Sequence, residues 1–103
     1  MGDRAMAEIK TAEGSLYFYT HWCGSELPYH ATEAVKTASA RKGDNSYALR
    51  IVIDQLIKRC GARDQETGAG IMFSPNCEDS YNGDNPSVVI DLSSMSIKVF
   101  GSH

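Results

Sequence analysis

The residues most able to do chemistry lie in one short aromatic stretch, LYFYTHWCGSELP, at positions 16–28. His21 and Cys23 are two residues apart, so on a strand their side chains lie on the same face. A thiolate at Cys23 with its pKa lowered by His21 is the arrangement of a nucleophile and its base. No helix N-terminus or third orienting residue is evident beside them. We therefore favour a structural interpretation, with Cys23 as a buried filler and His21 as a hydrogen-bonding side chain.

A metal site has less support from the spacing of the possible ligands. The imidazole and thiol ligands in the sequence are His21, Cys23, His30, Cys60 and Cys77. None of them has the short paired spacing of structural zinc, so we predict no metal and no cofactor.

Two loop segments resemble ligand-binding loops only weakly. The acids at positions 78, 79 and 84 lack the carboxylate rhythm of an EF-hand loop. The GAG at 68–70 precedes a strand instead of opening a helix, so it lacks the amide cradle and helix dipole of a phosphate loop. We interpret both as turn residues.

The cysteines also bear on the compartment. Three cysteines at wide spacing, an odd number without a CxxC pair, argue against a disulfide framework. We predict three free thiols in a reducing cytoplasm.

Composition predicts one globular domain over residues 1–103, with 42% hydrophobic and 22% charged residues. The net charge is −3 and the basic residues are scattered among acids, which argues against nucleic-acid binding. No apolar run approaches the roughly 18 residues of a membrane span, and the start lacks a signal-peptide core. The ends, 1–6 and 101–103, are expected to be tag-derived or disordered. So small a core favours a homo-oligomer, most simply a dimer.

The hydrophobic pattern predicts the order strand, helix, helix, strand, strand, strand. Residues 15–22 alternate as a strand, and helical spacing follows over 27–42 and from about 46 to 60. Short strands are expected within 69–74, 87–92 and 95–100, the last two as a hairpin. One-sided helices need a sheet to cover. We therefore expect an α+β two-layer sandwich with both helices on one face of a four-stranded, mostly antiparallel sheet.

This arrangement places Tyr17, Tyr19 and His21 on the sheet face away from the helices, joined by Val89 and Asp91. An exposed aromatic surface of this kind marks an interface or a ligand site more often than plain solvent contact. Three interpretations stay open: a subunit interface, a site for a ligand or partner, or a face covered by loops of the chain itself.

The segments YTHWCGSELP, DNSYALRIVIDQLI, ETGAGI and VVIDL resemble, in order and spacing, a family of short uncharacterised proteins of bacterial genomes, phages and mobile elements. The residues that match its pattern are Thr20, His21, Trp22, Gly24, Ser25, Tyr47, Arg50, Glu66, Thr67 and Gly68. Cys23 stands where that pattern has glycine, which weakens the thiol hypothesis. The resemblance implies no activity.

Two functions follow as hypotheses. The first is a small cytoplasmic binding or accessory module, phage-related or from a mobile element, that self-associates and binds a protein or small molecule. Its expected binding residues are Tyr17, Tyr19, His21, Trp22 and Ser25.

The alternative is a small hydrolase or transferase, with His21 as general base, Glu66 as its orienting residue and Arg50 as anion holder. We expect the residues around His21 to form, first of all, a fixed corner between strand and helix. Ser25 or Glu26 would satisfy free amides at the helix start.

Overall fold

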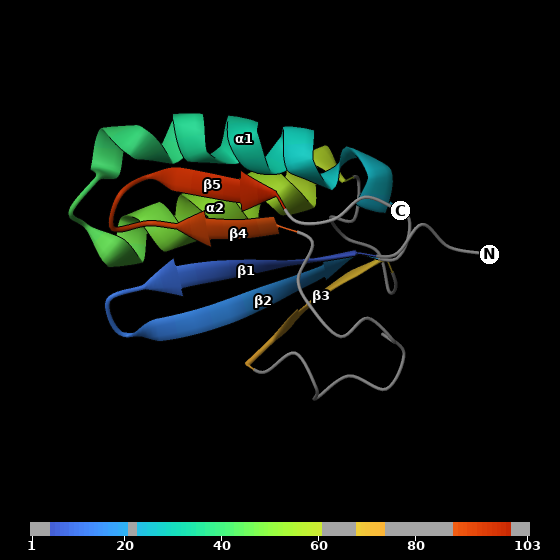
Figure 1. The fold of residues 1–103 in the computed structure, drawn as a ribbon, viewed down its shortest axis with the longest axis horizontal. Helices are drawn as coiled ribbons and strands as arrows, with labels where there is room; N and C mark the ends of the chain where they lie inside the picture. Colours follow the sequence, from blue (N-terminus) through green and yellow to red (C-terminus); the bar gives the residue numbers. More distant parts are fainter. Residues whose placement is uncertain (1–4, 21–22, 61–67, 74–87, 100–103) are drawn as a thin grey trace.

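A computed structural model of the chain describes residues 5–20, 23–60, 68–73 and 88–99. It is an α+β fold with two α-helices and five strands. The elements in chain order are β1 (Ala5–Thr11), β2 (Gly14–Thr20), the 3-10 turn η1 (Gly24–Glu26), α1 (Leu27–Ala38), η2 (Ser39–Arg41), α2 (Asn45–Arg59), β3 (Ala69–Met72), β4 (Val88–Asp91) and β5 (Ser96–Val99). Figure 1 shows the helices together on one side of the sheet.

The sheet differs from the expected one because it contains a strand that the sequence pattern did not predict. The strand order is β3-β2-β1-β4-β5, and β1 pairs antiparallel with β2 and parallel with β4. Within the described residues the sheet is therefore five-stranded and mixed. The expectation of four strands was wrong, whereas three of the four strand pairings are antiparallel, as expected. Ala5 and Met6 were expected to belong to a tag-derived or disordered end, but both are buried in the central strand β1.

The helices begin and end close to where the sequence predicts them. Pro28 lies at the first turn of α1, where the missing N–H costs no intrahelical bond. Gly43, with a φ of +92°, allows the sharp turn into α2, and Cys60 caps the far end of that helix. Among the described residues, no helix is long and apolar enough to cross a membrane.

The main core lies between the helices and one face of the sheet. Its strand residues alternate along the chain, as a half-covered sheet requires. They are Ala5, Ala7, Ile9, Phe18, Val88 and Ile90. The helices contribute a stripe of small and medium side chains: Leu27, Ala31, Ala34, Val35 and Ala38 from α1, with Ala48, Val52 and Leu56 from α2. The alanines let the two helices pack closely on the sheet.

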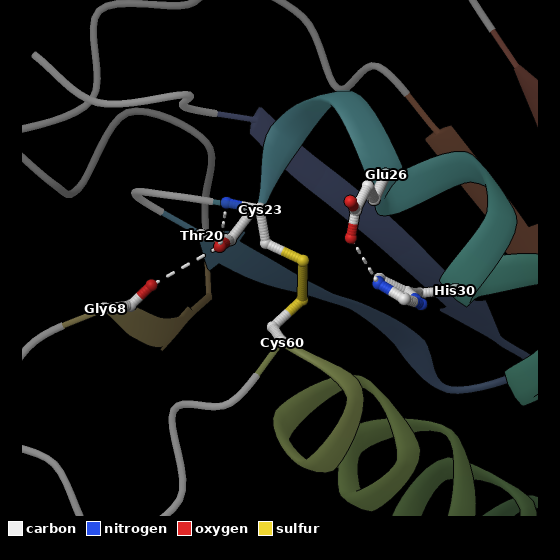
Figure 2. Close-up of a disulfide and its surroundings, with 6 residues drawn as sticks. All are labelled: Thr20, Cys23, Glu26, His30, Cys60 and Gly68. Carbon is white, nitrogen blue, oxygen red and sulfur yellow. Dashed lines mark hydrogen bonds and ion pairs between the residues drawn. A yellow bond between two sulfur atoms is a disulfide. The ribbon is translucent and has the colours of Figure 1, made fainter.

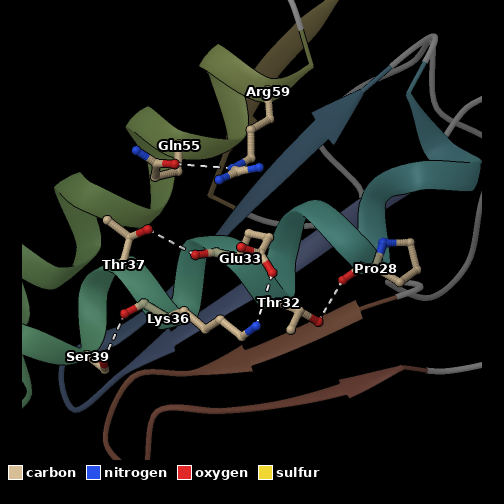
Figure 3. A network of polar contacts seen from close by, with 8 residues as sticks. All are labelled: Pro28, Thr32, Glu33, Lys36, Thr37, Ser39, Gln55 and Arg59. Atoms are coloured by element: carbon tan, nitrogen blue, oxygen red, sulfur yellow. Dashed lines mark hydrogen bonds and ion pairs between the residues drawn. The ribbon is translucent and has the colours of Figure 1, made fainter.

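The outward surface of the helices carries short-range polar contacts. Figure 3 shows Thr32 and Thr37 donating to the carbonyls of Pro28 and Glu33, four residues earlier, at 2.9 and 3.0 Å. Lys36 Nζ lies 3.2 Å from Glu33 Oε2. All of these contacts lie within a single helix. The Glu33–Lys36 pair supports the helix weakly, whereas the threonine bonds only satisfy their own hydroxyls, and none of them makes a site.

Replacing Ile9 by alanine should destabilise the protein by about 2–5 kcal/mol, because the side chain is fully buried in the central strand and its loss leaves a cavity. Its neighbour Lys10 is exposed, so Lys10→Ala should change the free energy of unfolding by no more than about 0.5 kcal/mol. Urea denaturation of both variants checks this. Equal stabilities would show that β1 does not form the centre of the sheet.

Candidate functional site

A buried threonine organises the corner where β2 passes into the first helix. Thr20 ends β2 and is 1% exposed. Its hydroxyl oxygen accepts from the Cys23 backbone N–H at 3.2 Å, and the hydroxyl donates to the Gly68 carbonyl at 3.4 Å. The Glu26 N–H then donates to the Cys23 carbonyl at 3.2 Å as η1 begins. These bonds join the strand end, the helix start and the residue before β3. The expected corner also involved His21 and Trp22, which lie outside the described residues, so that part stays a prediction.

Cys23 and Cys60 form a disulfide across this corner (Figure 2). Their Cα atoms are 5.7 Å apart and 37 positions separate them in sequence. The prediction of free thiols was therefore wrong for these two residues, and Cys77 lies outside the described residues. Wide spacing misled the prediction because the tertiary fold, and not the sequence distance, brings two thiols within bonding range. This pair therefore gives no support to the predicted location in a reducing cytoplasm.

Glu26, the last residue of η1, and His30, in the first turn of α1, lie beside the disulfide (Figure 2). His30 Nε2 is 3.3 Å from Glu26 Oε1, with the His30 side chain 12% exposed and the Glu26 side chain 72% exposed. One ligand atom each from Cys23, Glu26 and His30 lies within 4.8 Å of the others. From the sequence, His30 was considered only as an isolated metal ligand. Its i,i+4 spacing to Glu26 could have indicated that the two side chains meet on one helix face.

The start of α1 lacks the expected side-chain cap from Glu26. This residue occupies the N-cap position but makes no capping bond, because its carboxylate turns to His30 instead. Ser25 is exposed in η1.

The sheet face away from the helices carries the tyrosines that the sequence placed there. The β1–β2 register sets Glu8 opposite Tyr17 and Met6 opposite Tyr19, and Glu8 also lies opposite Val89 in β4. Tyr17 and Val89 therefore share this face, as predicted. Tyr19 is 7% exposed and packs with Met6 and Met72 in a second small core. It was wrong to expect an open surface at Tyr19, because the single chain already buries it.

Tyr17 lies half-buried next to a carboxylate. Ser15 Oγ donates to Glu8 Oε2 at 2.9 Å, and the Tyr17 phenol also hydrogen-bonds Glu8. Burial, followed by the charge of Glu8 and this hydrogen bond, raises the pKa of Tyr17 above its ordinary value of 10.0.

The residues proposed for catalysis are not brought together by the described part of the chain. Arg50 lies exposed on α2. His21, Trp22 and Glu66 lie outside the described residues, so the general-base hypothesis stays a prediction.

Removing the disulfide should destabilise the protein by about 2–4 kcal/mol, because the bond closes a long loop in the unfolded chain. We expect Cys60→Ser to show this loss in denaturant titrations without reductant. Cys77→Ser, which removes one thiol and keeps the pair, is the matched control. If a reductant leaves the unfolding midpoint of the parent protein unchanged, the disulfide does not contribute to the free energy of unfolding.

Tyr17 should make the protein less stable at alkaline pH. Its folded pKa lies above the unfolded value, so its stabilising contribution is complete below pH 10.0 and falls as the pH rises through the folded pKa. Tyr17→Phe should reduce this alkaline loss. Glu8→Gln should move the pKa of Tyr17 back toward 10.0, and Glu13→Gln, in the exposed β1–β2 turn, should not. Difference absorbance titration and urea denaturation measure both effects.

Comparisons with protein-family models, curated proteins and solved structures find no significant match to this chain. The resemblance to short proteins of bacteria, phages and mobile elements therefore stays a prediction, and the function has to be argued from the geometry alone.

Proposed function

We propose that this protein is a small self-associating binding module whose contact surface is the edge strand β3. The single observation that carries the proposal is the exposure of Phe73 and Ile71, which are 86% and 49% exposed. Large apolar side chains left in water at a sheet edge are typical of an interaction surface.

One of the two exposed side chains, Ile71, lines an apolar pocket on the helix side of the sheet. Ile71 pairs with Phe18, whose side chain belongs to the core under the helices, so Ile71 points to the same side. A pocket of about 160 Å³ lies between α2 and β3, lined by Phe18, Ile57, Ala69, Gly70 and Ile71. The described residues of its walls offer apolar contact and no charged side chain.

The edge of β3 lacks the charges that usually protect such a strand. Its sequence, AGIM, has no Lys, Pro or acid, whereas β5 at the opposite edge carries an exposed Lys98. Figure 1 shows β3 at the side of the sheet opposite β5. An unprotected edge strand offers backbone donors and acceptors to a further strand.

We assign that further strand to β3 of a second copy. In the proposed dimer a two-fold axis runs perpendicular to the sheet beside Ile71. It places Ile71 of one copy opposite Ile71 of the other, and Ala69 of one copy opposite Phe73 of the other. Both belong to the face that carries the pocket, so Phe73 of each chain would lie beside the pocket wall of the other. The contact is self-complementary, and it places the self-association surface at β3 instead of at Tyr19.

The test is the mass of the protein in solution at micromolar concentrations, measured by sedimentation equilibrium. The parent protein should be a dimer. Phe73→Lys should weaken the dimer at least about a hundredfold, because the symmetric contact buries two Phe73 side chains and each contributes about 1.5–3 kcal/mol. Val99→Lys is the matched control, since Val99 is 53% exposed on the opposite edge strand.

Circular dichroism should show that both variants keep the parent fold. A monomeric parent protein, or a dimer that Val99→Lys dissociates and Phe73→Lys does not, would refute the proposed surface. A monomer that binds an added strand-forming peptide through β3 would show instead a binding module for other chains.

A further inference from the structure

We propose that Cys23, Glu26, His30 and Cys60 form a zinc site when the disulfide is reduced. The corner is then held by the disulfide in the oxidised protein and by a bound zinc ion in the reduced protein. The proposal concerns a different surface from β3 and does not depend on self-association. Two thiolates, one imidazole and one carboxylate are a ligand set that zinc accepts in tetrahedral geometry.

The four residues are already gathered by the fold. Cys23, Glu26 and His30 have ligand atoms within 4.8 Å of one another, and Cys60 is bonded to Cys23. Zinc holds its ligands at about 2.0–2.3 Å, which corresponds to ligand separations somewhat below 4.8 Å. The 3.3 Å between His30 Nε2 and Glu26 Oε1 already suits a shared ion. Small side-chain movements would close the rest.

Two of the proposed ligands are buried enough to hold an ion. A third is exposed, so an ion can enter from solvent. Cys23 is 8% exposed and the His30 side chain 12% exposed, so two ligands stand inside the protein surface. The Glu26 side chain is 72% exposed and marks the solvent side. Figure 2 shows the His30 ring and the Glu26 carboxylate directed toward each other beside the sulfur atoms.

His30 lacks the bonds of a purely structural histidine. Its Nδ1 atom is buried and has no hydrogen-bond partner within the described part of the chain. Its one described polar partner is Glu26, a mostly exposed carboxylate. A buried imidazole normally satisfies both nitrogens, and a ring held by so little can reorient toward a ligand.

The chemistry balances with a dithiol as the reductant. The dithiol gives two electrons and two protons to the Cys23–Cys60 bond, which yields two thiols and one oxidised dithiol. Zinc binding then releases the two thiol protons, and the thiolates become ligands. A disulfide, such as the oxidised dithiol, reverses both steps: it takes two electrons from the two thiolates and two protons from solvent, becomes a dithiol, and the Cys23–Cys60 bond re-forms as the ion leaves. In either state the β2–α1 corner stays tied to the end of α2.

The experiment uses the full chain in two redox states, with zinc alone as the added probe. The protein reduced by a dithiol and then freed of it without air should bind one zinc ion per chain, and the oxidised protein should bind none. Bound zinc is counted by elemental analysis after gel filtration, and the affinity is measured by competition with a chromophoric chelator. Zinc should also raise the melting temperature of the reduced protein.

Variants that keep both cysteines separate ligation from folding. His30→Gln and Glu26→Gln can be checked for the parent fold in the oxidised state and should each weaken zinc binding at least about tenfold after reduction. Glu33→Gln, one helical turn further along α1 from His30, is the matched control and should bind as the parent does. Cys77→Ser should also retain the site.

Three results would overturn the proposal. The reduced parent protein binds no zinc, or the oxidised protein binds it as tightly as the reduced one, or both His30→Gln and Glu26→Gln bind it like the parent. Zinc bound to a reduced chain that lacks the native circular dichroism spectrum counts equally against a site built by the fold.

Discussion

The pairing of β1 on both of its sides is the constraint on which the rest of the structure depends. It bonds antiparallel to β2 and parallel to β4, so it fixes where the sheet's two halves meet. Its residues Ala5, Ala7 and Ile9 face the helices, while Met6 faces the second small core behind the sheet. One strand therefore supplies both cores. A loss of pairing here would expose both at once.

The helices do not cover the sheet evenly, and this asymmetry decides which apolar side chains stay exposed. Helix α1 packs over β1, β4 and β5, and α2 packs over α1 and β1. Strand β3 lies at the far edge, where Ile71 and Phe73 stay in contact with water. On the opposite face the apolar side chains around Tyr19 are already buried. The fold therefore buries the apolar surface expected at Tyr19 and leaves Ile71 and Phe73 exposed.

The corner at Thr20 joins short-range and long-range order. A hydrogen bond from the Cys23 N–H to the Thr20 hydroxyl joins the end of β2 to the residue before η1, and the disulfide ties Cys23 to the end of α2. The partly buried His30–Glu26 pair then lies against the sulfur atoms. The Cys23–Cys60 bond at this point links the start of α1 to the end of α2 beside the end of β2.

The sequence by itself determined the local elements, including both helices with their buried stripes, four of the five strands, and the placing of Tyr17 and Val89 on one sheet face. Periodicity suffices for these because side-chain direction repeats every 3.6 or 2 residues. It missed β1, whose alanines have little strand preference, and it misjudged Cys23 and Cys60. The tertiary structure alone decided the parallel pairing, the burial of Tyr19 and the disulfide corner, because each of them joins residues far apart in sequence whose contact depends on how the elements pack.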